Sequence, residues 1–292
     1  MNIAFASMEE SDRAPLMARY VESLRRRNGE ISDSSLQLPA REGFLARWAA
    51  SNPGWSGRAP TEAYQRIVGG GAIHRDDPRL ALWMAYMAMT NQAEEYGVNV
   101  RLDDELPGEG DEKEAYQYIA REELYHTRML LDGVRALGVN ASLAPPPLGL
   151  RLFLRFFPRL PTMWTDCITL IAEAVGITLF CRLRAIAMEL FEGTSMGAHL
   201  TSLVDEIIID EVGHVTFLRS RLGERGLRWA RRLSPVVIPL LMRSFPMAGP
   251  LLGLEAYRRM VDTFTWDDLP PGVRARAFGP YCRDTMFQAV AS

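Results

Sequence analysis

The sequence of 292 residues has little of several features, and each scarcity excludes some classes of fold or function. It contains three cysteines (Cys167, Cys181 and Cys282) and no CxxC pair, which argues against a disulfide framework and against a rubredoxin-like iron site. Lysine is nearly absent, with Lys113 the only one among 33 basic residues, and the formal net charge is −3. Such a charge gives no reason to expect nucleic acid as a partner.

Long uninterrupted apolar runs are also missing. The most apolar stretch, 233–254, is cut by four prolines and contains Arg243, whereas a membrane-spanning helix needs about 20 mostly unbroken apolar residues. We expect a buried, kinked helix pair there, with lipid or membrane contact as the alternative, and no integral membrane segment. The first residues, MNIAFASMEESDRAP, show no basic stretch followed by an apolar run, so no secretion signal is expected. Together with the odd number of cysteines this favours a cytoplasmic location.

Alternating patterns typical of β-strands are absent, and helix start and stop signals are frequent. They predict an all-α protein built as a four-helix bundle with additional N- and C-terminal helices. Each of the four helices exceeds twenty residues. The first begins at Asp77-Pro78, and the second begins at the capping-box pattern DEKE (111–114). Their expected ranges are 77–100, 111–138, 162–193 and 195–223. We expect one domain over 1–292, with the bundle core at 77–222 and flanking helical segments at 1–76 and 223–292.

Two short motifs occur twice on these helices. The first and third helices carry AEEYGV (93–98) and AEAVGI (172–177), and the second and fourth carry REELYHT (121–127) and IDEVGHV (209–215). The latter two each contain an acidic residue followed by Glu-x-x-His. Residues three apart lie on one face of a helix, so each Glu and His can reach one metal ion together.

The repeated pattern predicts a metal centre in the core of the bundle. Four carboxylates and two neutral imidazoles carry four negative charges, which two divalent cations neutralise. Without metal, packing four carboxylates together would raise their pKa values strongly or unfold the site. The alternative is that these residues have structural roles only, on solvated helix faces, as core histidines or in interhelical ion pairs. A single Glu-x-x-His motif would favour this alternative. Helix phase alone leaves Glu94 and Glu95 open, although alignment of the two halves selects Glu94. The predicted ligands are Glu94, Glu123, His126, Glu173, Glu211 and His214.

This pattern resembles the ferritin-like non-haem di-iron carboxylate proteins, which include ribonucleotide reductase small subunits, bacterial multicomponent monooxygenases, acyl desaturases, aldehyde-deformylating oxygenases and arylamine N-oxygenases. The resemblance covers residues 77–222. It implies that the six predicted ligands bind two Fe ions, with Mn/Fe as the other option. It also implies that Glu122 and Asp210 hold the opposite histidines in orientation without binding metal. Further implications are O2 as co-substrate, a small-molecule substrate and an external electron donor; a homodimer is left open.

Chain length and layout are most similar to the arylamine N-oxygenase-like group, with one departure. That group has an additional iron-binding histidine one turn before the second Glu-x-x-His, where this sequence has Ile207. His199 lies too far along the same helix to replace it, and His74 is expected to be structural or at the surface. Amine N-oxygenation is therefore an analogy only.

Several residues near the predicted ligands are candidates for a substrate pocket. They are Tyr116, Gly97, Gly176 and Phe180, and Gly213 is a third glycine that would leave space close to a ligand. Tyr116 is also the better candidate for a redox tyrosine, because Tyr125 faces elsewhere on its helix. The stretch LRLFLRFFPRL (150–160) is basic and apolar. It is expected to be a lid or crossover packed on the bundle, and contact with a membrane surface or an acyl chain is the alternative.

Two classes of function follow. The first is an O2-activating non-haem di-iron oxygenase or oxidase acting on a small organic substrate by N-oxygenation, hydroxylation, desaturation or C–C cleavage. The second is a ferritin-like or rubrerythrin-like iron-handling protein without an organic substrate. The flanks 1–76 and 223–292 favour the first class, because a storage subunit needs little beyond four or five helices.

Overall fold

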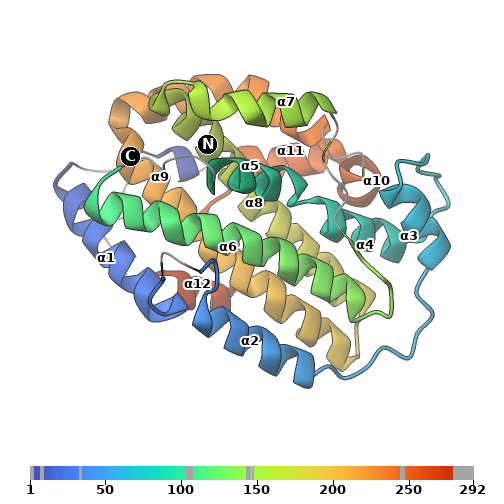
Figure 1. The fold of residues 1–292 in the computed structure, drawn as a ribbon. Coiled ribbons are helices and arrows are strands. Elements are labelled where there is room, and N and C mark those ends of the chain that lie inside the picture. The colour runs from blue at the N-terminus through green and yellow to red at the C-terminus, as the bar shows by residue number, and fades with distance from the viewer. Residues whose placement is uncertain are drawn as a thin grey trace.

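The structure is a computed structural model that describes residues 3–6, 10–32, 35–102, 108–142, 146, 148–243 and 247–278. All regular elements in these ranges are helices (Figure 1), which confirms the predicted all-α class. The long helices are α1 (Glu10–Asn28), α2 (Pro39–Ala50), α4 (Arg79–Met89), α5 (Gln92–Leu102), α6 (Gly110–Arg135), α8 (Thr162–Leu190) and α9 (Ser195–Arg243). The shorter ones are η1 (Ile3–Phe5), α3 (Thr61–Val68), α7 (Leu148–Phe156), η2 (Phe157–Arg159), α10 (Ala248–Leu252), α11 (Leu254–Thr263), η3 (Trp266–Asp268) and α12 (Pro271–Phe278).

The first of the expected long helices is two helices, α4 and α5, separated at Thr90 and Asn91. The hydroxyl of Thr90 donates to the carbonyl oxygen of Tyr86 over 2.6 Å, and the amide of Asn91 donates to the carbonyl oxygen of Glu123 over 2.9 Å. Side chains that bond backbone groups in this way compete with helix continuation. The prediction of one continuous helix over 77–100 is therefore wrong, and the break lies beside a predicted metal ligand.

Two helix starts also differ from expectation. Asp77 does not cap α4; its carboxylate accepts a hydrogen bond from the backbone N–H of His74, and Pro78 is the residue that precedes the helix. Helix α6 begins at Gly110, one residue before Asp111, and no side chain caps it. Both helices depend on packing of their buried faces more than on capping.

Helix α9 contains two helical segments joined at Gly223, whose φ of 60° interrupts the regular backbone. Glycine tolerates a positive φ because it has no Cβ atom, and the fourth expected helix ends at this residue as the sequence predicts. The segment after it includes Pro235 and Pro239 and is less buried than expected, since Val236 is 62% exposed and Leu240 56% exposed. The expectation of a buried helix pair over 233–254 is wrong for this part; residues 244–246 lie outside the described residues.

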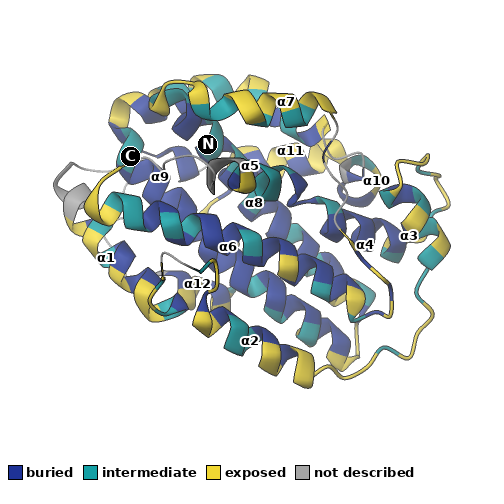
Figure 2. Cartoon of the chain, in the orientation of Figure 1, coloured by how far each residue is buried: buried dark blue, intermediate teal, exposed yellow. Residues whose placement is uncertain are grey.

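The core lies between α4, α6, α8 and the first segment of α9. Helices α8 and α9 make extensive contact, and α6 contacts α4, α5 and α9. Figure 2 shows that α6, α8 and the first segment of α9 are buried over most of their length. Large apolar side chains fill the space between them, among them Trp83, Tyr86, Met129, Phe180 and Phe217.

Segments from both ends of the chain pack against this core. Helix α1 contacts α6 and α9, α2 contacts α1, and α12 contacts α9. Cys167 and Cys181 are free thiols, and Cys282 lies outside the described residues. Among the helices that the structure describes, none combines the length and the apolar character that crossing a bilayer requires.

Candidate metal centre

Three helices bring four ligand-type side chains to one buried point. Glu123 on α6, Glu173 on α8, and Glu211 and His214 on α9 each have a ligand atom, and these atoms lie within 4.8 Å of one another. All four residues are buried. Carboxylate oxygens and imidazole nitrogens at such separations suit a divalent metal ion, so the cluster can hold one.

Both histidines turn Nδ1 toward these carboxylates. Nδ1 of His126 lies 3.2 Å from Oε2 of Glu123 and 3.4 Å from Oε1 of Glu211. Nδ1 of His214 lies 3.1 Å from Oε1 of Glu123 and 3.6 Å from Oε2 of Glu173. Each oxygen of Glu123 therefore faces one histidine, and His126 lies beside the group of four. The two ring centroids are 5.7 Å apart.

Several polar atoms in this cluster have no hydrogen-bond partner among the described residues. They are Oε1 of Glu123, Oε2 of Glu173, Oε2 of Glu211 and Nδ1 of His214, one from each member of the group of four. A buried polar atom without a partner costs about 1–3 kcal/mol, so native proteins rarely leave several together. The arrangement fits a site in which these atoms bind a cation.

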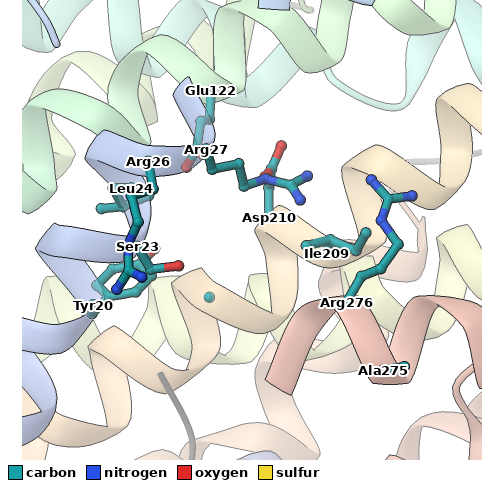
Figure 3. A pocket seen from close by; sticks show the side chains of 11 residues that line it. Tyr20, Ser23, Leu24, Arg26, Arg27, Glu122, Ile209, Asp210, Ala275 and Arg276 are labelled. Atoms are coloured by element: carbon teal, nitrogen blue, oxygen red, sulfur yellow. The ribbon is translucent and has the colours of Figure 1, made fainter. Parts of the chain in front are cut away.

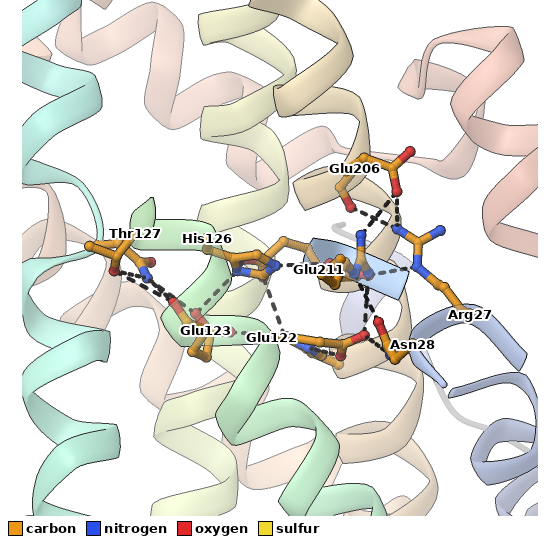
Figure 4. A network of polar contacts seen from close by, with 12 residues as sticks. Arg27, Asn28, Glu122, Glu123, His126, Thr127, Glu206 and Glu211 are labelled. Atoms are coloured by element: carbon orange, nitrogen blue, oxygen red, sulfur yellow. Dashed lines mark hydrogen bonds and ion pairs between the residues drawn. The ribbon is translucent and has the colours of Figure 1, made fainter. Parts of the chain in front are cut away.

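The other ring nitrogen of each histidine contacts a carboxylate on the opposite helix. Nε2 of His126 on α6 is 3.1 Å from Oδ2 of Asp210 on α9, and Nε2 of His214 on α9 is 3.1 Å from Oε2 of Glu122 on α6. Figure 4 shows His126 with Glu122, Glu123 and Glu211 around it. If Nε2 carries the proton, these contacts leave Nδ1 as the acceptor that can ligate a metal ion.

Asp210 and Glu122 are in turn bonded to residues from the N-terminal flank (Figure 4). Arg27 donates from Nε to Oδ1 of Asp210 over 2.9 Å, and Asn28 donates from Nδ2 to Oε1 of Glu122 over 2.8 Å. Arg41 on α2 donates to Oδ1 of Asp210 and lies 3.5 Å from Oε1 of Glu122. The flank thus fixes the two carboxylates that contact the histidines.

Sequence reasoning missed this support. Arg27, Asn28 and Arg41 belong to no motif, and the resemblance does not extend to them. The RRRN run at the end of α1 is visible in the sequence, but helix-end arginines are ordinarily solvated and interact favourably with the helix dipole. Only the fold shows that Arg27 is turned inward while Arg26 is mostly exposed.

Burial and mutual repulsion make the metal-free cluster hold protons. Burial, and then the neighbouring Glu123 and Glu173, raise the pKa of Glu94. Burial, and then Glu173, raise the pKa of Glu211. For His126 burial acts in the opposite direction, but Glu123 and Asp210 raise its pKa to about 9. His214 has a raised pKa as well, despite burial, because the carboxylates of Glu122 and Glu123 lie beside its two ring nitrogens.

We therefore expect metal binding to release protons and to strengthen as the pH rises. With its pKa raised to about 9, His126 is protonated in the metal-free protein at neutral pH, and a cation that binds this imidazole must displace a proton. Affinity should rise about tenfold per pH unit for each proton displaced, until the pH passes the pKa of His126 near 9. Anaerobic Mn(II) titrations at several pH values, with an indicator for released protons, measure this. An affinity independent of pH would contradict it.

The two candidate glutamates on α5 occupy different places. Glu94 lines a cavity together with Glu123 and Glu173, and these two carboxylates act on its pKa. Glu95 does not line that cavity, although its Oε2 is buried without a hydrogen-bond partner among the described residues. Glu94 is not one of the four residues whose ligand atoms lie within 4.8 Å of one another. It stands at the edge of the cluster, on the side of the cavity.

That cavity has a volume of about 230 Å³ and reaches the cluster at Glu94, Glu123, Glu173 and His214. Side chains from α5, α6, α7, α8 and α9 line it, and most of them are apolar. The cavity lies between α5, the second part of the first expected helix, and α8, the third expected helix, and α7 covers it. The four pocket candidates Tyr116, Gly97, Gly176 and Phe180 all line it.

Gly213 differs from the other two glycines. A Cβ atom at Gly213 would lie 2.9 Å from the ring of Tyr20, so the missing side chain makes room for α1 and not for a substrate. At Gly176 a Cβ atom would lie 3.6 Å from Oε2 of Glu211, and at Gly97 it would lie 3.8 Å from Leu154 of α7. Gly213 lines a cleft beside α1 and not the apolar cavity, so the space it leaves lies apart from the other pocket candidates.

Tyr116 lines the cavity with its hydroxyl bonded to Oδ1 of Asp166 over 3.2 Å. Tyr125 instead bonds Glu42 of α2, away from the cluster, as its helix position predicts. Of the remaining histidines, His199 stacks on Trp48 and does not join the site.

A second hollow lies on the other side of the histidines. Figure 3 shows Tyr20, Ser23, Arg26 and Arg27 of α1 facing Ile209 and Asp210 of α9 and Arg276 of α12, around a cleft of about 550 Å³. Glu122 and Asp210 line it as well. The candidate centre thus has an apolar cavity next to its possible ligand atoms. On the other side, a polar cleft lies next to Glu122 and Asp210, whose carboxylates contact Nε2 of the two histidines.

Comparison with protein-family models, with curated proteins and with solved structures finds no match to this chain. The class of protein is therefore defined by the fold and the site alone. It is an all-helical protein with a buried cluster of glutamate and histidine that can hold metal.

Proposed function

We propose that the protein is an O2-activating di-iron oxygenase or oxidase that acts on a small, largely apolar organic molecule. The observation that carries the proposal is the apolar cavity that ends at the carboxylate–histidine cluster. An iron-handling protein would need the cluster but not an apolar chamber beside it.

The residues present fit two iron ions. Glu123 and Glu211 each approach both histidines, Glu173 approaches His214, and Glu94 stands at the cavity edge. Together with the two imidazoles, these four carboxylates are the six residues that would hold the metals. Iron held there supplies the binding and reduction of O2.

The chain's own side chains would bind and orient the substrate. Leu150, Leu154 and Phe157 cover the cavity from one side, and Phe180 and Phe217 line it from the core. The polar lining outside the ligands includes Thr90, Tyr116 and Thr169, and no arginine of the described part of the chain lines the cavity. A negatively charged substrate would find no basic side chain outside the metal-binding cluster there, which favours an uncharged apolar molecule over an anion. Ile207, fully buried, stands where the arylamine N-oxygenases have a further histidine, so the reaction class is left open.

The test is O2 consumption by iron-loaded protein supplied with a chemical reductant. An oxygenase should stop at about two iron ions per chain, and small apolar molecules should stimulate its O2 uptake. Uptake of many more iron ions per chain, with ferric mineral as the product and no stimulation, would support the iron-handling alternative instead.

Filling the cavity should separate substrate binding from metal binding. Gly97→Leu places a side chain in the space between α5 and Leu154, so we expect metal content to stay near that of wild type. Stimulated O2 uptake should fall by about tenfold or more, because the leucine side chain would occupy part of the volume that the substrate needs.

The matched control is Gly272→Leu, at a position where a Cβ atom meets nothing within 4 Å. It should leave both metal content and stimulated O2 uptake unchanged. A Gly97→Leu variant that behaves like this control would show that the cavity does not hold the substrate.

A further inference from the structure

Exposed apolar side chains gather on two segments beside the cavity. On α7 and the turn after it, Leu148, Leu152 and Phe156 follow each other at helical spacing and are 64%, 48% and 55% exposed. On the last segment of α9, Val236 is 62% exposed and Leu240 56% exposed. Among the described residues, these two segments hold seven of the eleven large apolar side chains that are exposed. Single exposed apolar residues are ordinary, but such a concentration indicates a contact surface.

Helix α7 is apolar on its inner side as well. Leu150, Leu154 and Phe157 line the cavity, and Leu241 of α9 lines it too. Figures 1 and 2 show α7 along one edge of the molecule, above α5, with exposed residues along its length. The apolar side chains of α7 thus extend beyond the face that lines the cavity, and no residue of α7 is buried.

The same two segments are strongly basic. Residues 148–160 contain Arg151, Arg155 and Arg159, residues 225–243 contain five arginines, and neither segment contains an acidic residue. Although the net charge of the chain is −3, these segments carry eight arginines, of which Arg228 pairs with Glu224 just before the second segment. Within the described ranges, no carboxylate pairs with the three arginines of α7 and its following turn. The guanidinium carbon of Arg159 lies over the ring of Phe156, 5.3 Å from the ring centroid, and Arg159 is exposed to solvent.

We propose that residues 148–160 and 225–243 form a basic apolar surface that binds the face of an anionic lipid bilayer. Leucine and phenylalanine side chains would enter the boundary of the acyl region, and the guanidinium groups would pair with lipid phosphates, which arginine binds through two hydrogen bonds. A second copy of the chain fits less well. A two-fold contact through this surface would place the same arginines against one another. The binding does not depend on what the metal centre does, although it would place the cavity next to the bilayer.

Binding of the full-length chain to vesicles tests the proposal. Vesicles of equal parts phosphatidylglycerol and phosphatidylcholine should sediment the protein at low ionic strength, and pure phosphatidylcholine vesicles should not. Raising the salt from about 0.1 M to about 0.5 M should weaken the binding, since screening shortens the reach of the arginine charges. Failure to bind the anionic vesicles at low salt would overturn the proposal, and so would equal binding to both kinds.

Two double variants separate the apolar and the charged contributions. Leu152→Glu with Phe156→Glu, and Arg155→Glu with Arg159→Glu, should each weaken vesicle binding on the order of tenfold or more. Their controls are Leu36→Glu, at a leucine with the same 48% exposure as Leu152, and Arg58→Glu, at an exposed arginine outside both segments. Variants that bind like their controls would contradict the assignment. A wild-type dimer that Leu152→Glu with Phe156→Glu dissociates would show that a second copy covers this surface instead.

Discussion

Glu211→Ala will leave the protein unable to hold two metal ions. Wild-type protein loaded anaerobically with Fe(II) and freed of excess metal should approach two iron ions per chain, and the variant should fall below one. The expected effect is large because Glu211 reaches both histidines: Oε1 lies 3.4 Å from Nδ1 of His126 and Oε2 lies 3.9 Å from Nδ1 of His214. Its Oε2 also has no hydrogen-bond partner among the described residues.

Folding should not suffer from this change. Burial, and then Glu173, raise the pKa of Glu211, so its charged form is already disfavoured in the metal-free protein. Removing it relieves crowding of like charges. The metal-free variant should therefore unfold at a denaturant concentration close to that of wild type. Glu211→Gln, which keeps the volume and removes the charge, should show the same loss of iron.

The matched control is Glu224→Ala, on the second segment of α9, where the glutamate side chain is 65% exposed. It should keep the wild-type iron content. Two iron ions per chain in Glu211→Ala would remove this residue from the centre. A wild-type maximum of one ion would show that the cluster is a single-metal site.

The sequence predicted those parts of the fold that depend on local spacing. Glu123 and His126, and Glu211 and His214, are three apart on helices, so their shared faces follow from helical geometry alone. The breaks at Gly138 and Gly223 follow from the positive φ that glycine tolerates, and both are present. The metal-binding role of the six residues stays a prediction. The structure brings Glu123, Glu173, Glu211 and His214 together and places His126 and Glu94 beside them.

The interruption of the first long helix could not be predicted in the same way. Residues 79–102 are almost uniformly compatible with helix, and neither glycine nor proline stands at Thr90 and Asn91. The break is stabilised by a tertiary contact, because the amide of Asn91 donates to the carbonyl oxygen of Glu123 on α6. The preference of the chain for a break at these two residues therefore follows from the packing of α6 beside α4 and α5, and not from the local sequence.

The support of the histidines depends on contacts between distant parts of the chain. Arg27 and Asp210 are 183 residues apart, and Arg41 and Asp210 are 169 residues apart. No periodicity links such positions in a single sequence. The structure buries three acidic residues around the histidines, Glu122, Glu206 and Asp210. Buried carboxylates need partners, so the need for cations was predictable although their identity was not.

Arg41→Ala will destabilise the metal-free protein by about 3–5 kcal/mol, the usual cost of removing one partner from a buried ion pair. The Arg41 side chain is 2% exposed. Its Nη1 lies 2.9 Å from Oε2 of Glu206, its Nε donates to Asn28 over 2.8 Å, and its Nη2 bonds Asp210. Although burial alone raises the pKa of Asp210, Arg27 and then Arg41 lower it below its usual range. The variant therefore leaves a buried carboxylate poorly compensated.

Denaturant unfolding of metal-free wild type, Arg41→Ala, Arg41→Lys and Arg47→Ala at one pH measures this effect. Arg47 is exposed on the same helix α2, and its removal should change stability by less than about 0.5 kcal/mol. Lysine at position 41 should restore only part of the loss, because an ammonium group cannot make the forked contacts of a guanidinium group. If Arg41→Ala costs less than about 1 kcal/mol, Arg27 alone is enough to stabilise Asp210, and Arg41 is not the main support of the carboxylate that contacts His126.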